Sequence, residues 1–241
     1  MNCKFAREGR LLRITLARPE KRNALDAALC RALVDTIEAA SPDDTGAIFL
    51  DAEGPSFCAG MDLAESLTAN PAELTALHER LFTIGRRSQV PIAAYVNGHA
   101  IAGGLGLVAN AHLVMAGEDA CFGLSELRVA LWPFLVYRAV EDALGARRTL
   151  AWTLHAGVYS AAAAREAGLV HAIADAGTAL AMARELAARL PDAVRAGMQY
   201  YRESRGLDHA AAGALAARLR TGLMSSPGYV EAVRQFRDRK K

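Results

Sequence analysis

Short apolar segments that alternate with amphipathic ones limit most strongly how this chain can fold. Four segments have the length and pattern of β-strands, namely 11–17, 47–51, 91–96 and 112–116. Two segments between them, 26–40 and 71–87, have the spacing of amphipathic helices, the first with Asp26 as its N-cap. Strands that alternate with helices usually form a parallel sheet with helical crossovers, so the sequence predicts an α/β core.

The character of the chain changes after Pro133. Strand patterns nearly vanish, apart from 169–174, and the short segment after Ser160 is predicted to be a helix that Ser160 caps and Gly168 ends. From 177 to 241 the spacing is helical and rich in Ala and Arg, and the charged end at 237–241 is typical of a solvated terminus. We therefore expect an α/β core over 1–175 and a helical region over 176–241.

Composition excludes several classes of protein. The 241 residues carry 28 basic and 26 acidic side chains, a formal net charge of +2, which gives no basic surface for nucleic acid or membranes. The four cysteines include no C-x-x-C pair and the six histidines are scattered, so neither a metal site nor a disulfide framework is expected. No apolar run approaches the roughly 18 residues of a membrane span, and the N-terminus lacks a signal core, so we expect a cytoplasmic location.

Two glycine-containing loops, 56–63 and 97–106, each follow a predicted strand. Glycine lets the backbone approach a ligand closely, and a helix beginning near Gly103 would direct unpaired N–H groups toward it. Two converging N–H groups would stabilise an oxygen that gains negative charge during a reaction. A single glycine-rich turn is usually only a turn, so the argument depends on the pair of loops.

One other glycine pattern suggests a dinucleotide site. Residues 104–109 fit G-x-G-x-x-A, and Glu126 follows about twenty residues later. That fingerprint should begin directly after its strand, whereas the seven residues 97–103 intervene here. We therefore reject nicotinamide binding.

Motifs in a fixed order resemble those of the crotonase superfamily, also called the enoyl-CoA hydratase/isomerase family. They are RPEKRNAL at 18–25, FCAGMDL at 57–63, the glycine-rich loop at 97–104, FGLSE at 122–126 and the segment 160–170. The resemblance covers roughly 10–175. It implies a spiral of ββα repeats, with C-terminal helices that complete the pocket and assemble a homotrimer or a dimer of trimers.

The resemblance also assigns roles to residues. The substrate would be an acyl-CoA thioester, with coenzyme A as part of the substrate and no separate cofactor. Backbone N–H groups of Met61 and Gly103 would bind the thioester oxygen. Arg18, Lys21 and Arg22 would be natural partners for the phosphates, although a solvated loop is an equal alternative. The remaining binding positions would be Arg22 again, Ala24, Ala59, Gly60, Asp62, Leu63, Ile101, Gly104 and Trp132.

Glu126 matches a catalytic glutamate of the family. A useful base would need its pKa raised above the usual value of about 4.3, and Leu127, Val129 and Trp132 could supply the apolar surroundings. The second glutamate of classical hydratases would stand at Gly106. One glutamate is enough to move a proton between carbons, as in isomerases and one-glutamate lyases of the family. A catalytically silent acyl-CoA-binding homologue remains the alternative.

Overall fold

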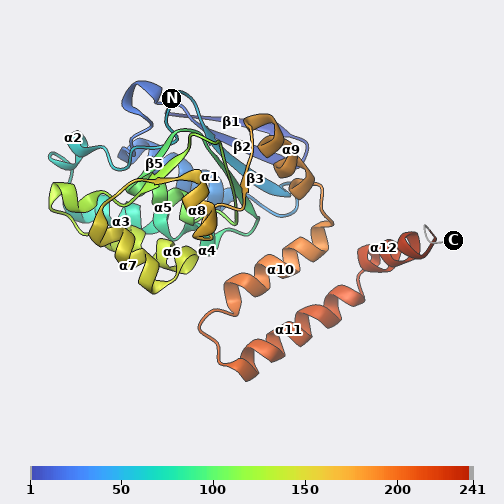
Figure 1. Ribbon diagram of the computed structural model, residues 1–241. Helices are drawn as coiled ribbons and strands as arrows, with labels where there is room; N and C mark the ends of the chain where they lie inside the picture. The colour runs from blue at the N-terminus through green and yellow to red at the C-terminus, as the bar shows by residue number, and fades with distance from the viewer. Residues whose placement is uncertain (1, 239–241) are drawn as a thin grey trace.

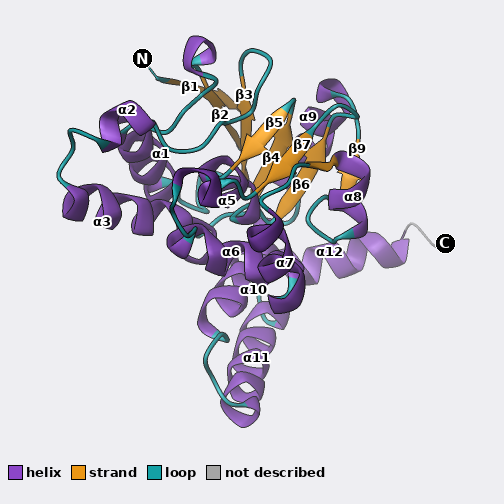
Figure 2. Ribbon diagram, turned by 60° about the vertical axis from the view of Figure 1, so that its left-hand side comes forward, coloured by secondary structure: helices purple, strands orange, loops and turns teal. Residues whose placement is uncertain are grey.

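The computed structural model describes residues 2–238, and two sheets form its centre (Figure 2). The larger sheet has the strand order β1-β2-β3-β4-β6-β9, with β1 antiparallel to β2 and all other neighbours parallel. Its strands are β1 (Cys3–Glu8), β2 (Leu11–Leu16), β3 (Ala47–Ala52), β4 (Ile92–Val96), β6 (Leu113–Ala116) and β9 (Ala172–Ile173). The smaller sheet has the order β5-β7-β8, with β5 (His99–Ile101), β7 (Cys121–Gly123) and β8 (Tyr159–Ser160).

From β4 to β7, successive strands alternate between the two sheets. The chain places β4 in the larger sheet and β5 in the smaller one, and then repeats the step with β6 and β7. Helix α5 (Gly103–Ala109) follows β5, and the short 3₁₀ helix η2 (Glu126–Val129) and α6 (Phe134–Leu144) follow β7. This winding is the spiral of ββα turns, so the predicted α/β fold class is confirmed.

The helices between strands follow the predicted amphipathic pattern. Helix α1 (Ala27–Ala39) begins at Asp26, whose carboxylate accepts a hydrogen bond from the Leu29 N–H at 2.7 Å. The predicted helix over 71–87 is divided into α3 (Pro71–Phe82) and α4 (Ile84–Arg87), because Thr83 leaves the helical conformation at φ −115° and ψ 4°. The others in this part are η1 (Pro19–Lys21), α2 (Leu63–Ser66), α7 (Ala146–His155) and α8 (Ala161–Glu166).

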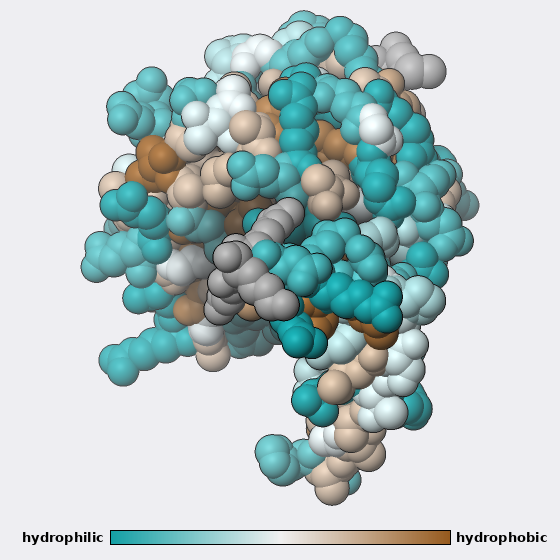
Figure 3. All heavy atoms as spheres, turned by 90° about the vertical axis from the view of Figure 1, so that its right-hand side faces the viewer, coloured by the Kyte–Doolittle hydropathy of each residue, from teal (hydrophilic) through white to brown (hydrophobic). Residues whose placement is uncertain are grey.

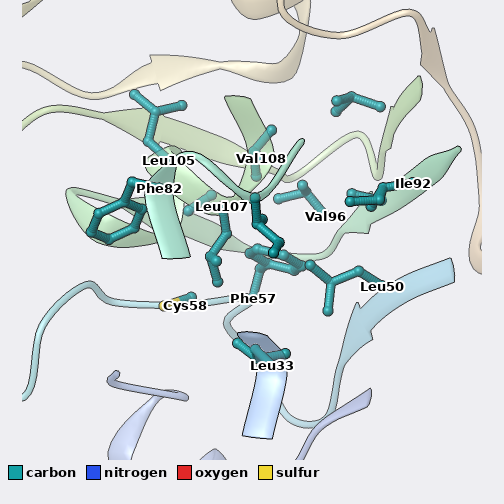
Figure 4. Close-up of a cluster of buried hydrophobic side chains, with 14 of the residues drawn as sticks. Leu33, Leu50, Phe57, Cys58, Phe82, Ile92, Val96, Leu105, Leu107 and Val108 are labelled. Carbon is teal, nitrogen blue, oxygen red and sulfur yellow. The ribbon is translucent and has the colours of Figure 1, made fainter. Parts of the chain in front are cut away.

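The larger sheet is covered on both faces. One face packs with α1, α3 and α5 into the main hydrophobic core, which Figure 4 shows in part. Helix α9 (Ala176–Ala187) covers the other face, where Ala179, Ala183 and Ala187 pack near Phe49 and Ala93. Small residues on α9 let the helix lie close to the strands, so the sheet is buried as a parallel sheet must be.

Three C-terminal helices extend from this body as an arm (Figures 1 and 3). They are α10 (Pro191–Glu203), α11 (His209–Met224) and α12 (Pro227–Asp238). Helices α10 and α11 each bury one residue, Met198 and Leu215, and α12 buries none. The predicted helical region is present up to Asp238, and the remainder of the charged end, 239–241, lies outside the described residues. Within 2–238, no helix combines the length and apolar character needed to cross a membrane.

Several strands differ from the prediction. Strand β1 has only one buried residue, and an exposed edge strand carries no apolar pattern that would reveal it. Strands β5, β7 and β8 have two or three residues each and were not predicted. The strand predicted over 169–174 is wrong in its extent, because only Ala172 and Ile173 pair with β6. Ser160 does cap α8, since its hydroxyl accepts from the Ala163 N–H at 3.2 Å.

Candidate active site

A cavity of about 670 Å³ lies between the two glycine-containing loops, α3 and the segment that joins η2 to α6. Its walls are mainly apolar. The residues that line it include Ala59, Met61, Leu63, Leu74, Thr75, His78, Phe82, Ile101, Gly103, Glu126, Trp132, Leu135 and Val136. A concave apolar cavity with a few polar groups is the usual form of a small-molecule site.

The first loop is held by backbone pairing with the segment around Leu25. The Leu25 N–H donates to the Gly60 carbonyl at 2.8 Å, and the Asp62 N–H donates to the Leu25 carbonyl at 3.0 Å. Gly60 has φ +97°, a conformation that glycine adopts without strain. Between these two pairs the Met61 N–H has no acceptor among the described residues, and Met61 lines the cavity.

The second loop pairs with the first. The Cys58 N–H donates to the His99 carbonyl at 2.9 Å, and the Ile101 N–H donates to the Cys58 carbonyl at 3.0 Å. Ala102 then has φ +52°, an uncommon conformation for a residue with a side chain, and α5 begins directly after it. In the described chain the N–H of Gly103 finds no acceptor either, because it lies at the first position of the helix.

The two unpaired donors come from loops in direct contact. A Cβ on Gly60, the neighbour of Met61, would lie 3.3 Å from the Gly103 nitrogen. A Cβ on Gly104 would lie 2.2 Å from the Cys58 carbonyl oxygen, so the backbone of α5 lies directly against the first loop. This arrangement brings two free N–H groups and the positive end of a short helix to one wall of the cavity.

Glu126 lies at the start of η2, three residues after the end of β7. Its side chain lines the same cavity, only 8% of the residue is exposed, and Oε2 has no hydrogen-bond partner in the described chain. Burial raises the pKa of Glu126 from 4.5 to about 7. Val129 and Trp132 line the cavity near it, whereas Leu127 does not and is 38% exposed.

No second carboxylate stands at Gly106. A Cβ there would lie 2.8 Å from Cδ1 of Phe82 and 3.1 Å from Cγ2 of Val136. The Phe82 ring itself is buried, and Figure 4 shows it near Leu105 of α5. The space for a side chain at position 106 is therefore occupied by aromatic carbon.

The predicted binding residues divide into two groups. Ala59, Leu63, Ile101 and Trp132 line the cavity, together with Met61, Gly103 and Glu126. Five others do not line it, namely Arg22, Ala24, Gly60, Asp62 and Gly104. The Asp62 carboxylate instead caps α2 and pairs with Arg18, while Gly104 provides the close contact with Cys58. Arg22 and Ala24 belong to the neighbouring loop, where the Arg22 carbonyl accepts from the Ala59 N–H at 3.0 Å.

Arg18 has an internal partner on each side. Its guanidinium pairs with Asp26 at 3.1 Å and with Asp62 at 3.2 Å, and its side chain is largely buried. These ion pairs connect the 18–25 loop to the N-termini of α1 and α2. Lys21 and Arg22, in contrast, are exposed. A phosphate would meet Lys21 and Arg22 more readily than Arg18.

Three residues near the site were not predicted from the sequence. Asn23 is completely buried: its Oδ1 accepts from the Arg18 N–H at 2.8 Å, and its Nδ2 donates to the carbonyls of Glu53 and Ser56. His78 and Phe82 line the cavity from α3. The amphipathic pattern of α3 could have identified these two as facing the core, because they lie one helical turn apart. Cys58 of the first loop is fully buried, and burial raises the pKa of its thiol to about 12.

The known proteins that this chain matches in sequence or in structure are CoA hydratases or belong to one family that includes them. A family model described as enoyl-CoA hydratase/isomerase matches residues 6–241. A mevalonyl-coenzyme A hydratase of Aspergillus fumigatus is 33% identical, over 96% of this chain and 90% of its own. A 2,3-dehydroadipyl-CoA hydratase of Escherichia coli is 31% identical, over 83% of this chain and 81% of its own. The solved structure of an enoyl-CoA hydratase of Mycobacterium smegmatis superposes with a TM-score of 0.93 at 27% identity, covering 99% of this chain and 97% of that one.

Proposed function

The chain belongs to the enoyl-CoA hydratase/isomerase family, and on that premise we propose that it binds an acyl-CoA thioester and transfers a proton through Glu126. The proposal rests on the functional groups that line one cavity. It contains a buried carboxyl with a pKa of about 7 and two N–H groups that have no acceptor in the described chain. Those are the groups that enolate chemistry requires.

The N–H groups of Met61 and Gly103 would hold the thioester oxygen. Removal of a proton next to a thioester carbonyl moves negative charge onto that oxygen, and fixed N–H donors stabilise the charge as it develops. Both donors are backbone groups of two loops that are hydrogen-bonded to each other, so their positions need little reorganisation during the reaction.

Glu126 would exchange the proton. A carboxyl with a pKa of about 7 is about half ionised at neutral pH, so it can accept a proton from one carbon and return it to another. Its apolar surroundings keep this pKa high, because the charged form is poorly solvated there. Retention of such a group favours an active enzyme over a silent acyl-CoA-binding homologue.

The Phe82 ring beside Gly106 favours transfer of a proton between carbons over addition of water to a double bond. The Phe82 ring fills the position from which a second glutamate would orient water, so isomerisation of a double bond, or a one-glutamate lyase reaction, needs nothing more than the groups present. Hydration is the second candidate, and the relatives from A. fumigatus and E. coli named as hydratases favour it.

The family assembly is the second part of the proposal. The C-terminal arm exposes Tyr229, Val230, Val233 and Phe236 on α12, which suits a helix that packs on a partner subunit. We therefore propose a homotrimer or a dimer of trimers. Multi-angle light scattering that gives a monomer at micromolar concentration would contradict it.

The decisive experiment is incubation with a 2-enoyl-CoA and a 3-enoyl-CoA of equal chain length, followed by mass spectrometry. Isomerisation leaves the mass unchanged and gives a chromatographic peak at the position of the other enoyl-CoA, whereas hydration adds one water. A lyase reaction would cleave the hydrated product into a shorter acyl-CoA and an aldehyde. Glu126→Gln should slow whichever reaction the wild type performs by about 10²–10⁴-fold. If neither thioester reacts, and calorimetry detects no binding of either, the proposed function is wrong.

A further inference from the structure

His78 is the second buried titratable side chain of the cavity. It lies on α3, only 7% of the residue is exposed, and no described residue hydrogen-bonds to its Nε2. Its nearest ring neighbour is Phe82, with ring centroids 5.7 Å apart. An unpaired polar ring among apolar side chains is unfavourable in the empty protein, because it has lost water and gained no partner.

Two other histidines, His112 and His171, have ring nitrogens that hydrogen-bond to backbone groups. Nδ1 of His112 accepts from the Ile92 N–H at 2.8 Å, and its Nε2 lies 3.0 Å from the Gly85 carbonyl oxygen. Nδ1 of His171 accepts from the Val114 N–H at 3.0 Å. Both rings bind backbone groups and have a structural role. His78 differs from them because it lines the cavity and its Nε2 is buried without a partner in the described chain.

Burial lowers the pKa of the His78 imidazole and so favours its uncharged form. A neutral imidazole presents one donor and one acceptor, so it suits a hydroxyl or carbonyl group. It suits a hydrocarbon chain poorly.

The position of His78 on α3 places it beyond the oxyanion donors. It lies one turn before Phe82, and Cζ of Phe82 is 3.1 Å from where a Cβ of Gly103 would stand. Leu74 and Thr75, one turn further from Phe82, line the same wall. A thioester bound at Gly103 would therefore pass Phe82 before its acyl group meets His78.

We propose that the acyl group of the substrate carries a hydroxyl or keto oxygen that hydrogen-bonds to the imidazole of His78. This inference rests on the proposed function. An unsubstituted acyl chain would cover the ring with CH₂ groups and leave it unpaired, whereas an oxygenated acyl group would satisfy it. Sites that pair a buried polar group with the substrate discriminate strongly against analogues that lack the matching group.

The test compares enoyl-CoA thioesters of equal chain length, with and without one hydroxyl or keto group, at several positions along the chain. For the best oxygenated substrate, kcat/KM should exceed that of its plain counterpart by at least about 100-fold. His78→Phe should remove this preference, because kcat/KM should fall much further on the oxygenated substrate than on the plain one. His78→Gln, which keeps a donor and an acceptor, should retain most of it, and His209→Phe on the exposed end of α11 serves as the control.

The outcomes separate this inference from the proposed function. A wild type that turns over plain substrates as well as oxygenated ones at every position overturns the inference alone. So does a His78→Phe variant whose kcat falls equally on both substrates, because that result makes His78 an acid/base group. If no thioester binds or reacts, both proposals fall. Thermal unfolding checks that the variants fold, and His78→Phe should unfold at the same temperature as the wild type or higher, since it removes an unpaired polar ring.

Discussion

The ring of Phe82 occupies the space beside Gly106: a Cβ at position 106 would meet Cδ1 of that ring at 2.8 Å and Cε1 at 2.9 Å. Phe82 is buried and lines the cavity. The two residues are thus complementary, with a large side chain on α3 opposite a residue without one on α5. A carboxylate can be introduced at position 106 only if the aromatic ring shifts or is removed.

Gly106→Glu alone should destabilise the protein, because the new side chain overlaps a buried ring and overpacking costs about 1–3 kcal/mol. Combining Gly106→Glu with Phe82→Ala makes room for the carboxylate, and loss of the buried ring itself costs about 3–5 kcal/mol. If the new carboxylate reaches the substrate, the double variant should also raise the ratio of hydration to isomerisation. Thermal unfolding and product mass measure the two effects. A single variant as stable as the wild type would show that the Phe82 ring moves away freely.

Glu126→Gln should lower turnover by about 10²–10⁴-fold, which is the usual effect of removing a positioned acid or base. Thioester affinity should change little, because the substitution leaves the Met61 and Gly103 N–H groups in place. Steady-state kinetics and calorimetry measure both quantities. Glu118→Gln is the matched control, since Glu118 is exposed on the loop between β6 and β7. Full activity of Glu126→Gln would require another acid or base.

The raised pKa of Glu126 also makes stability depend on pH. The unfolded chain releases this proton near pH 4.5, whereas the folded protein keeps it until about pH 7. Between these values the folded state binds more protons, so the contribution to stability is complete below pH 4.5 and is lost as pH rises through 7. The loss amounts to about 3 kcal/mol.

Glu126→Gln lacks this ionisation. Its stability relative to the wild type should therefore increase from pH 5 to pH 8 by about 2–3 kcal/mol. Urea unfolding of both proteins at several pH values gives the difference. A difference that stays constant over this range would mean that Glu126 is not held in an apolar environment.

Asn23→Ala should destabilise the protein by several kcal/mol, because it removes three hydrogen bonds and leaves the buried Ser56 carbonyl and the half-buried Glu53 carbonyl unpaired. Turnover should fall as well, since Asn23 connects the 18–25 loop to the first glycine-containing loop. Asn70→Ala is the control: Asn70 only caps α3, so its loss should cost about 1 kcal/mol and leave turnover unchanged. Chemical denaturation and kinetics on the same preparations distinguish the two.

Sequence patterns predicted the site where it depends on local backbone structure. Gly103 and Glu126 begin helices and Met61 lies two residues before α2, and short sequence motifs mark such positions. The structure places all three at one cavity, while their catalytic roles stay predictions. Phe82 and His78 were not predicted as site residues. An amphipathic pattern predicts which face of α3 is buried, but it does not predict which residues pack against that face after folding. Arg18 looked like a phosphate partner because the sequence does not reveal that Asp26 and Asp62 lie beside it.

Gly104→Ala should separate the two loops that carry the N–H donors. The new Cβ would lie 2.2 Å from the Cys58 carbonyl oxygen and 2.9 Å from its carbon, and these backbone atoms cannot rotate away. The loops must therefore move apart. Stability should fall by about 1–3 kcal/mol, and turnover by about 10²–10³-fold, because oxyanion donors act only at hydrogen-bond distance.

Gly213→Ala on α11 is the control, since nothing lies within 4 Å of its new Cβ and alanine should stabilise the helix by about 0.5–1 kcal/mol. If Gly104→Ala keeps full turnover while unfolding more easily, the separation of the loops does not reach the donors, and the oxyanion site must be sought elsewhere in the cavity.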